Sequence, residues 1–207
     1  MEDKHNKLRQ EAWDLALHSF GKRFIFDRRA EKFSKYINAL KVFGIVTPVS
    51  VGATAMGYGT DSQILKPIIN IAVPLLIIQL LFSVLAVIFK WDDELAYSYE
   101  ASQDYNNLSN SFRKLGNTPP VDIDMLEKNL DILGARYQAR TEQDAKHSVK
   151  EWELRRGMRY ALREFRRECV GCRITPVSME STDCDVCGKF ETDLKKGVRK
   201  WTRRLFM

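Results

Sequence analysis

The chain has little of what marks several large protein classes. Its 207 residues include only 4 cysteines, 11 glycines and 6 prolines. So few cysteines exclude a disulfide-rich secreted scaffold. So little glycine and proline, in a chain that is 44% hydrophobic, exclude collagen-like, low-complexity and wholly disordered proteins. Phosphate-binding loops, dinucleotide fingerprints, nucleophile elbows and HExxH motifs are also missing, and the 3 histidines have no metal-ligand spacing. We therefore expect no enzyme and no catalytic residues.

Charged residues are present but unevenly distributed. The chain has 33 Lys and Arg against 27 Asp and Glu, a net charge of +6, and a mean hydropathy of −0.33, which suggests a soluble, mildly basic protein. Residues 42–60 and 67–89, however, contain no charged side chain. The second stretch is long enough to cross a membrane and the first is near the minimum. Buried core helices are the alternative, but two such stretches in succession favour a transmembrane hairpin over 42–89.

The positions of Lys and Arg predict how this hairpin is oriented. Between the two spans only Lys66 is basic, whereas many basic residues precede the first span. The positive-inside rule then places the N-terminus in the cytoplasm. Because two crossings return the chain to the same side, we expect the C-terminus there too.

Three hydroxyl side chains share one face of the first span. Thr47, Ser50 and Thr54 are spaced by three and four residues, which aligns them on a helix. Ala53 and Gly57 are small residues that permit close helix approach. One interpretation is that hairpins form a homo-oligomer and the hydroxyl face lines a pore. The other is that the hairpin only anchors the protein, because hydroxyls can bond to their own helix in lipid.

Long helices are predicted on both sides of the hairpin. Residues 1–41 fit an amphipathic helix, which Gly21 could break. Residues 90–168 fit a helical region with a break at 116–120, Gly-Asn-Thr-Pro-Pro. Apolar residues recur at helical spacing along this region. They are Leu95, Tyr99, Leu108, Phe112, Leu115, Ile123, Leu126, Leu130, Leu133 and Tyr137. Gly134 and Gly157 weaken the helix locally.

Four arginines near the end of this region recur at intervals of four. They are Arg155, Arg159, Arg163 and Arg167, and on one helix they would form a single stripe. Such a stripe is a candidate anion-binding site for phosphates of nucleic acid, of anionic lipid or of a nucleotide signal. The alternative is a solvated basic face, since acidic residues are interspersed.

All four cysteines lie in one short module. Cys169, Cys172, Cys184 and Cys187 form the pattern CxxC-x11-CxxC in residues 169–188. Paired CxxC turns supply four thiolates for a tetrahedral metal, which favours structural Zn²⁺; an iron–sulfur cluster and a redox dithiol pair are the alternatives. The module either staples the fold or contacts nucleic acid or a partner. Residues 189–207 form a basic amphipathic tail, suited to an anionic membrane surface or to packing on its own protein.

These features predict an all-α membrane protein: a two-helix transmembrane hairpin, long cytoplasmic helices and a small zinc-ribbon-like module. The layout of residues 1–165 resembles the SLATT family of bacterial two-transmembrane effectors. The cysteine pattern resembles mobile-element proteins named for CxxC-x11-CxxC. The SLATT resemblance implies oligomers in the bacterial inner membrane that permeabilise it when a cyclic nucleotide or a partner protein delivers a signal in antiviral defence.

Two functions remain open on these grounds. The first is a pore-forming or membrane-disrupting defence effector whose partners are the lipid bilayer, further copies of the chain and its trigger. The alternative is a membrane-tethered adaptor, in which the zinc module and the arginines bind nucleic acid or a protein. Nucleic acid is a partner that the residues allow but do not favour.

Overall fold

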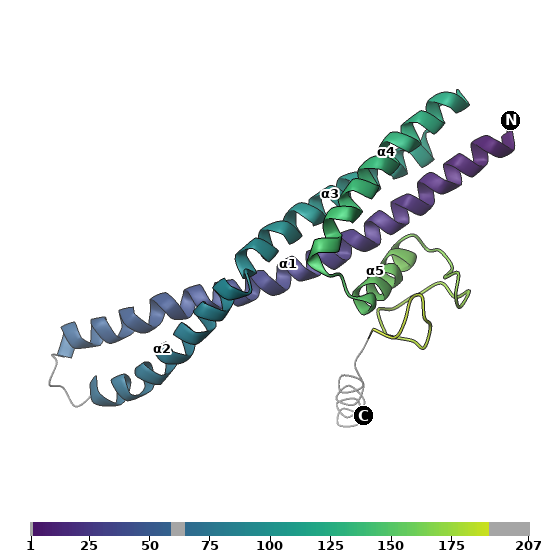
Figure 1. The fold of residues 1–207 in the computed structure, drawn as a ribbon. Coiled ribbons are helices and arrows are strands. Elements are labelled where there is room, and N and C mark those ends of the chain that lie inside the picture. Colours follow the sequence, from purple (N-terminus) through teal and green to yellow (C-terminus); the bar gives the residue numbers. More distant parts are fainter. Residues whose placement is uncertain (1, 59–64, 191–207) are drawn as a thin grey trace. The chain divides into compact units, whose positions relative to one another are not determined.

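A computed structural model describes residues 2–58 and 65–190, and within them the regular structure is entirely helical (Figure 1). The helices are listed here in chain order. They are α1 (Glu2–Tyr58), α2 (Leu65–Ile88), α3 (Trp91–Asn117), α4 (Ile123–Asp144), the short 3₁₀ helix η1 (Ala145–His147) and α5 (Glu151–Glu164). The four-cysteine module follows α5 as turns and extended chain.

The first helix is longer than the sequence pattern suggests. Residues 1–41 and the first apolar stretch, which we expected as separate segments, join in one helix of 57 residues. Gly21 does not break it, and Pro48 lies inside it. A proline inside a helix removes one backbone hydrogen bond and clashes with the preceding turn. Where the residues on both sides stay helical, a proline usually bends the helix and does not end it.

Local sequence explains where the other helices begin and end. Lys90, at a φ of 50°, separates α2 from α3. The predicted break at 116–120 falls between α3 and α4, and Asp122 caps α4 by accepting a hydrogen bond from the Asp124 amide at 3.1 Å. The continuous helix expected from 121 to 168 is wrong, because the chain turns at Ser148, at a φ of 43°.

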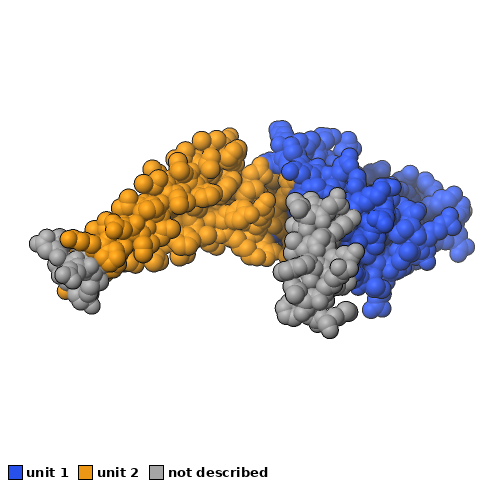
Figure 2. All heavy atoms as spheres, turned by 90° about the horizontal axis from the view of Figure 1, so that it is seen from below, with its two compact units in different colours: residues 1–27, 99–207 blue, residues 28–98 orange. Residues whose placement is uncertain are grey.

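The chain forms two compact units (Figure 2). Unit 1 contains residues 1–27 and 99–207, and unit 2 contains residues 28–98. Unit 1 has the larger core, in which Tyr105 and Phe112 of α3 and Leu126 of α4 are completely buried. The rings of Phe26 and Tyr105 stack with centroids 5.9 Å apart. These contacts hold α1, α3 and α4 together.

A polar network lies inside unit 1 next to this core. The Tyr105 hydroxyl donates to Asp144 at 2.5 Å, and the Lys22 ammonium donates to Thr141 at 2.7 Å and to Tyr105 at 3.2 Å. Burial lowers the pKa of Lys22, and burial raises the pKa of Tyr105. Arg140, itself buried, donates to Glu100 and Asp104 on α3. Since unpaired buried charges are costly, these pairs fix the register of α4 against α1 and α3.

Unit 2 consists of the second part of α1, helix α2 and the start of α3. Gly44 of α1 faces Gln79 of α2, and a Cβ on Gly44 would lie 2.6 Å from the Gln79 amide nitrogen. The rings of Tyr36 and Trp91 lie 5.6 Å apart. Few of its large apolar side chains are buried: Met56 is 92% exposed and Val87 is 77% exposed.

Two helices are long and apolar enough to cross a membrane. Apolar windows in α1 and α2 have mean hydropathies of 1.5 and 2.8. None of the first window and 11% of the second is buried within the protein. The predicted spans therefore correspond to exposed apolar helices, while the predicted link (61–66) and tail (189–207) lie mostly outside the described residues.

Candidate metal centre

The four cysteines converge after α5. The Cys169 and Cys184 sulfurs are 3.8 Å apart, the Cys172 and Cys187 sulfurs are 3.9 Å apart, and all four lie within 4.8 Å of one another. A disulfide would place two sulfurs about 2.05 Å apart, so these are free thiols. Four sulfurs this close together could all bind a single metal ion.

The two CxxC turns have the same backbone hydrogen bond. In the first, the Arg173 amide donates to the Cys169 carbonyl at 2.7 Å; in the second, the Gly188 amide donates to the Cys184 carbonyl at 2.9 Å. The Val186 amide also donates to the Cys184 sulfur at 3.4 Å. Each turn thus presents its two sulfurs on one side.

A glycine lets the chain pass closely at each turn. A Cβ on Gly171 would lie 2.8 Å from the Val186 side chain, and a Cβ on Gly188 would lie 2.2 Å from the Thr182 carbonyl. A Cβ at Gly188 would force the backbone at Thr182 to move, and a Cβ at Gly171 would force the Val186 side chain to move. The glycines therefore belong to the site as much as the cysteines do.

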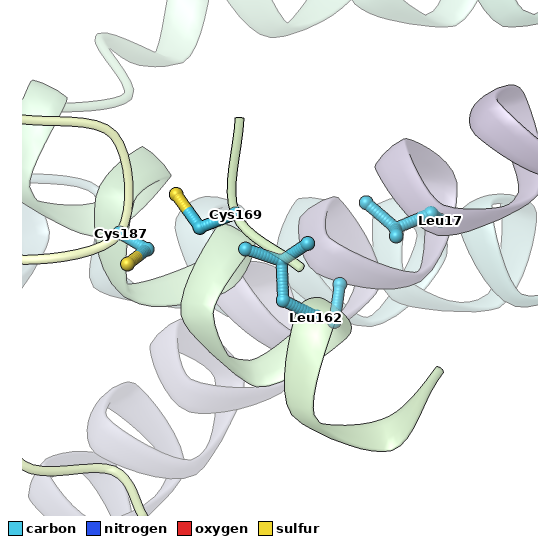
Figure 3. Packing of buried hydrophobic residues seen from close by; sticks show 5 residues of the cluster. Leu17, Leu162, Cys169 and Cys187 are labelled. Atoms are coloured by element: carbon cyan, nitrogen blue, oxygen red, sulfur yellow. The ribbon is translucent and has the colours of Figure 1, made fainter. Parts of the chain in front are cut away.

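Helix α5 lies between α1 and the cysteine module. Leu162 packs with Leu17 of α1 and with Cys169 and Cys187 in one buried cluster (Figure 3). On the α1 side, Tyr160 stacks on Phe24 with ring centroids 4.1 Å apart. The module has little apolar surface of its own, and it completes its core by covering α5.

Arg159 connects α5 to the module through hydrogen bonds. This side chain is 7% exposed. Its Nε donates to the Ser178 carbonyl at 2.8 Å, and its Nη1 lies 3.5 Å from the Cys187 carbonyl and 3.8 Å from the Cys187 sulfur. The arginine that the sequence suggested for external anions therefore faces the cysteines.

Of the other three predicted anion-binding arginines, Arg155 and Arg163 lie on α5 at intervals of four from Arg159, whereas Arg167 does not lie on this helix. Arg155 pairs with Glu151 at 2.6 Å, and Arg163 pairs with Glu164 at 2.5 Å. Arg167 lies beyond the end of α5, because Arg166 has a φ of 50°, and it pairs with Asp14 of α1 at 2.5 Å. The predicted stripe therefore loses Arg167, and anion binding by these residues stays a prediction.

The candidate pore residues lie on α1 in unit 2. The Ser50 hydroxyl donates to the Val46 carbonyl at 2.7 Å, and the Thr54 hydroxyl donates to the Ser50 carbonyl at 2.8 Å. Thr47 is half-buried. Both bonded hydroxyls are satisfied within their own helix, so this face suits lipid as well as a pore.

The thiols differ in how readily they lose a proton. Hydrogen bonding from the Cys187 backbone lowers the pKa of Cys184 to about 7, whereas burial raises the pKa of Cys187. A metal ion binds the thiolate form, so it would displace the proton of Cys187. Four protein ligands leave no open coordination position, which is the arrangement of a structural site.

A family model described as "Mobilome CxxCx(11)CxxC protein" matches residues 9–190. The match covers the helices of unit 1 and unit 2 as well as the cysteine module. No curated protein and no solved structure matches the chain.

Proposed function

This chain belongs to the mobilome CxxCx(11)CxxC protein family, and we propose that it is a membrane-anchored effector whose cysteines hold one structural Zn²⁺. The sulfur distances support zinc. Zn–S bonds of about 2.3 Å in a tetrahedron separate the sulfurs by about 3.8 Å, which is close to the 3.8 and 3.9 Å found here. A cluster of several irons would hold its cysteines further apart, because they bind different irons.

Zinc would act as a staple for the end of the chain. Metal binding supplies folding free energy to segments that cannot bury a core of their own. Cys169, Cys172, Cys184 and Cys187 would be the ligands, and they would hold the loops of residues 169–188 against α5. No chemistry of substrates is expected at a site with four protein ligands.

The observation that carries the membrane proposal is the exposure of apolar side chains in unit 2. From Val42 to Met56 on α1 and from Ile69 on α2 to Phe89 directly after it, most large apolar residues are more than one third exposed. Soluble monomers rarely leave so continuous an apolar surface in water. Lipid would cover it, with Tyr36 and Trp91 at the interface and both termini in the cytoplasm, in the inner membrane of a bacterium.

Association of hairpins would turn this anchor into an effector. Nothing lies within 4 Å of a Cβ placed on Gly52 or Gly57, so another helix could approach α1 closely at either residue. In this proposal, which rests on the resemblance of the sequence layout to SLATT effectors, copies of the chain assemble and permeabilise the membrane. Unit 1 would receive the trigger, a cyclic nucleotide or a partner protein, during antiviral defence.

The effector proposal is tested with the full chain in cells and in liposomes. Expression should depolarise the membrane, and the reconstituted protein should release a trapped dye. Thr47→Leu and Thr54→Leu should weaken both effects if their face lines the path, while Val49→Leu, on the exposed apolar surface of α1, serves as the control. If the cells are not depolarised and the two threonine variants are as toxic as the wild type, permeabilisation is rejected.

The adaptor is the second candidate and has less support. Its predicted phosphate-binding arginines have partners within unit 1: Glu151, Glu164, Asp14 and the cysteine module. Salt-dependent binding of DNA or RNA by the full chain in detergent would favour the adaptor. Binding lost in Arg163→Gln, a half-buried member of the set, would identify the surface.

A further inference from the structure

Arg159 is buried in a place where a positive charge needs a partner. It is 7% exposed, and its hydrogen bonds go to carbonyl oxygens, the Thr182 hydroxyl and one sulfur. Neutral acceptors offset little of the cost of burying a guanidinium. A negative group near Cys187 would offset much more.

The proposed metal centre supplies that negative charge. Four thiolates bring more negative charge than one divalent ion neutralises, so a bound Zn²⁺ leaves an excess on the sulfurs. The Arg159 Nη1 lies 3.8 Å from the Cys187 sulfur, within reach of an N–H···S hydrogen bond.

The same guanidinium contacts the chain before the second CxxC turn and the last residue of that turn. Nε donates to the Ser178 carbonyl, and Nη1 lies 3.5 Å from both the Thr182 hydroxyl and the Cys187 carbonyl. Ser178 and Thr182 lie in the segment that joins the two CxxC turns. The planar guanidinium thereby orients the loop that carries Cys184 and Cys187. The ammonium of a lysine, a single point charge, could not hold the same set of acceptors in place.

We propose that Arg159 is a positioning residue of the metal centre: it offsets the charge of the metal-bound thiolates and holds the second CxxC turn against α5. The proposal rests on metal binding by the four cysteines. Outer-sphere partners of this kind orient the ligands, and their loss commonly weakens metal binding by about 10- to 100-fold.

The test compares metal affinity in Arg159→Gln, Arg159→Lys and the matched control Arg155→Gln on the same helix. Full-length protein in detergent is titrated with Zn²⁺ against a chromogenic chelator and with Co²⁺, whose absorption bands report the thiolate ligands. Arg159→Gln should bind both ions about 10- to 100-fold more weakly and shift the charge-transfer band. Arg159→Lys should fall between Gln and wild type, and Arg155→Gln should match wild type.

Three outcomes would count against the proposal. Wild-type affinity and an unchanged Co²⁺ band in Arg159→Gln would overturn it while leaving the metal site intact. If Arg155→Gln weakens metal binding as much as Arg159→Gln does, the proposal is overturned, because the effect is then a general one on α5. A wild-type chain that binds neither ion would overturn both this proposal and the metal site. Helix content, measured by circular dichroism, separates these results from unfolding, and the Lys variant keeps the comparison if the Gln variant does not fold.

Discussion

Gly21 of α1 and Gly157 of α5 face each other at the closest approach of these two helices. A Cβ on Gly157 would lie 2.6 Å from the Gly21 carbonyl oxygen and 2.9 Å from the Ile25 side chain. A Cβ on Gly21 would lie 3.1 Å from the Gly157 carbonyl oxygen. The two helices contact through their backbones, and this contact brings α5 and the cysteine module onto α1.

Gly157→Ala should therefore destabilise the protein, although alanine is the better helix former. The added methyl group would force α5 away from α1, at a cost of about 1–3 kcal/mol. Gly134→Ala is the matched control: it lies inside α4 with nothing within 4 Å, and it should stabilise by up to about 1 kcal/mol. Denaturant unfolding of unit 1, followed in detergent, measures both. A stabilising Gly157→Ala would refute the close contact.

Metal analysis of purified protein should find about one zinc per chain, and Cys172→Ser should lose it. Removing one of four ligands opens the site to water and lowers the affinity severely. Strong chelators should have the same effect on the wild type and should increase proteolysis within residues 169–188, because the metal would no longer hold these loops. An iron–sulfur absorption band in the purified protein would instead contradict zinc.

Metal affinity should rise with pH. Burial raises the pKa of Cys187, so at neutral pH this thiol is protonated in the metal-free protein and must release its proton to bind. Each thiol that releases a proton makes the apparent affinity about tenfold stronger per pH unit below its pKa. Below pH 7 Cys184, with a pKa of about 7, adds to this slope. Co²⁺ titrations at several pH values measure it, and a flat profile would be inconsistent with protonated thiols.

Tyr105→Phe should destabilise unit 1 by about 1–3 kcal/mol. The variant keeps the ring that stacks on Phe26 but removes the hydroxyl that donates to Asp144 at 2.5 Å, which leaves a buried carboxylate with one donor fewer. Tyr99→Phe, at a position that is 56% exposed, should change stability by less than about 0.5 kcal/mol. Thermal unfolding of the two variants gives the comparison, and equal effects would contradict the role of the network.

Helical periodicity predicted much of the core of unit 1. Leu108, Phe112 and Leu115 on α3, together with Leu126 and Leu130 on α4, are buried as their spacing indicates. The prediction that Tyr99 is buried is wrong, because its side chain is exposed. Tyr105, the largest fully buried side chain among the described residues, was missed, because its neighbours in sequence are polar and its hydroxyl needs partners that only the folded chain supplies.

The cysteine cluster was predictable, but its surroundings were not. The CxxC spacing alone brings four sulfurs together, and the structure confirms that they converge. Gly157 was expected only to weaken a helix, because nothing local indicates which helix will cross it. The spacing grouped Arg159 with the other three arginines. Arg159 is buried because the chain turns after α5 and the loop of residues 173–183 covers this side chain.

The border between the two units falls inside helices, since α1 and α3 each contribute to both. No cut in the gene can therefore release unit 1 as one continuous piece. A fragment of residues 121–207 would carry every cysteine but neither Leu17 nor Gly21, and the apolar face of α5 would meet water. Recombination that transfers residues 151–190 alone would likewise deliver the ligands without the helix that covers them. The cysteine module is therefore not an independent folding unit. It can be inherited in working form only together with the beginning of the chain.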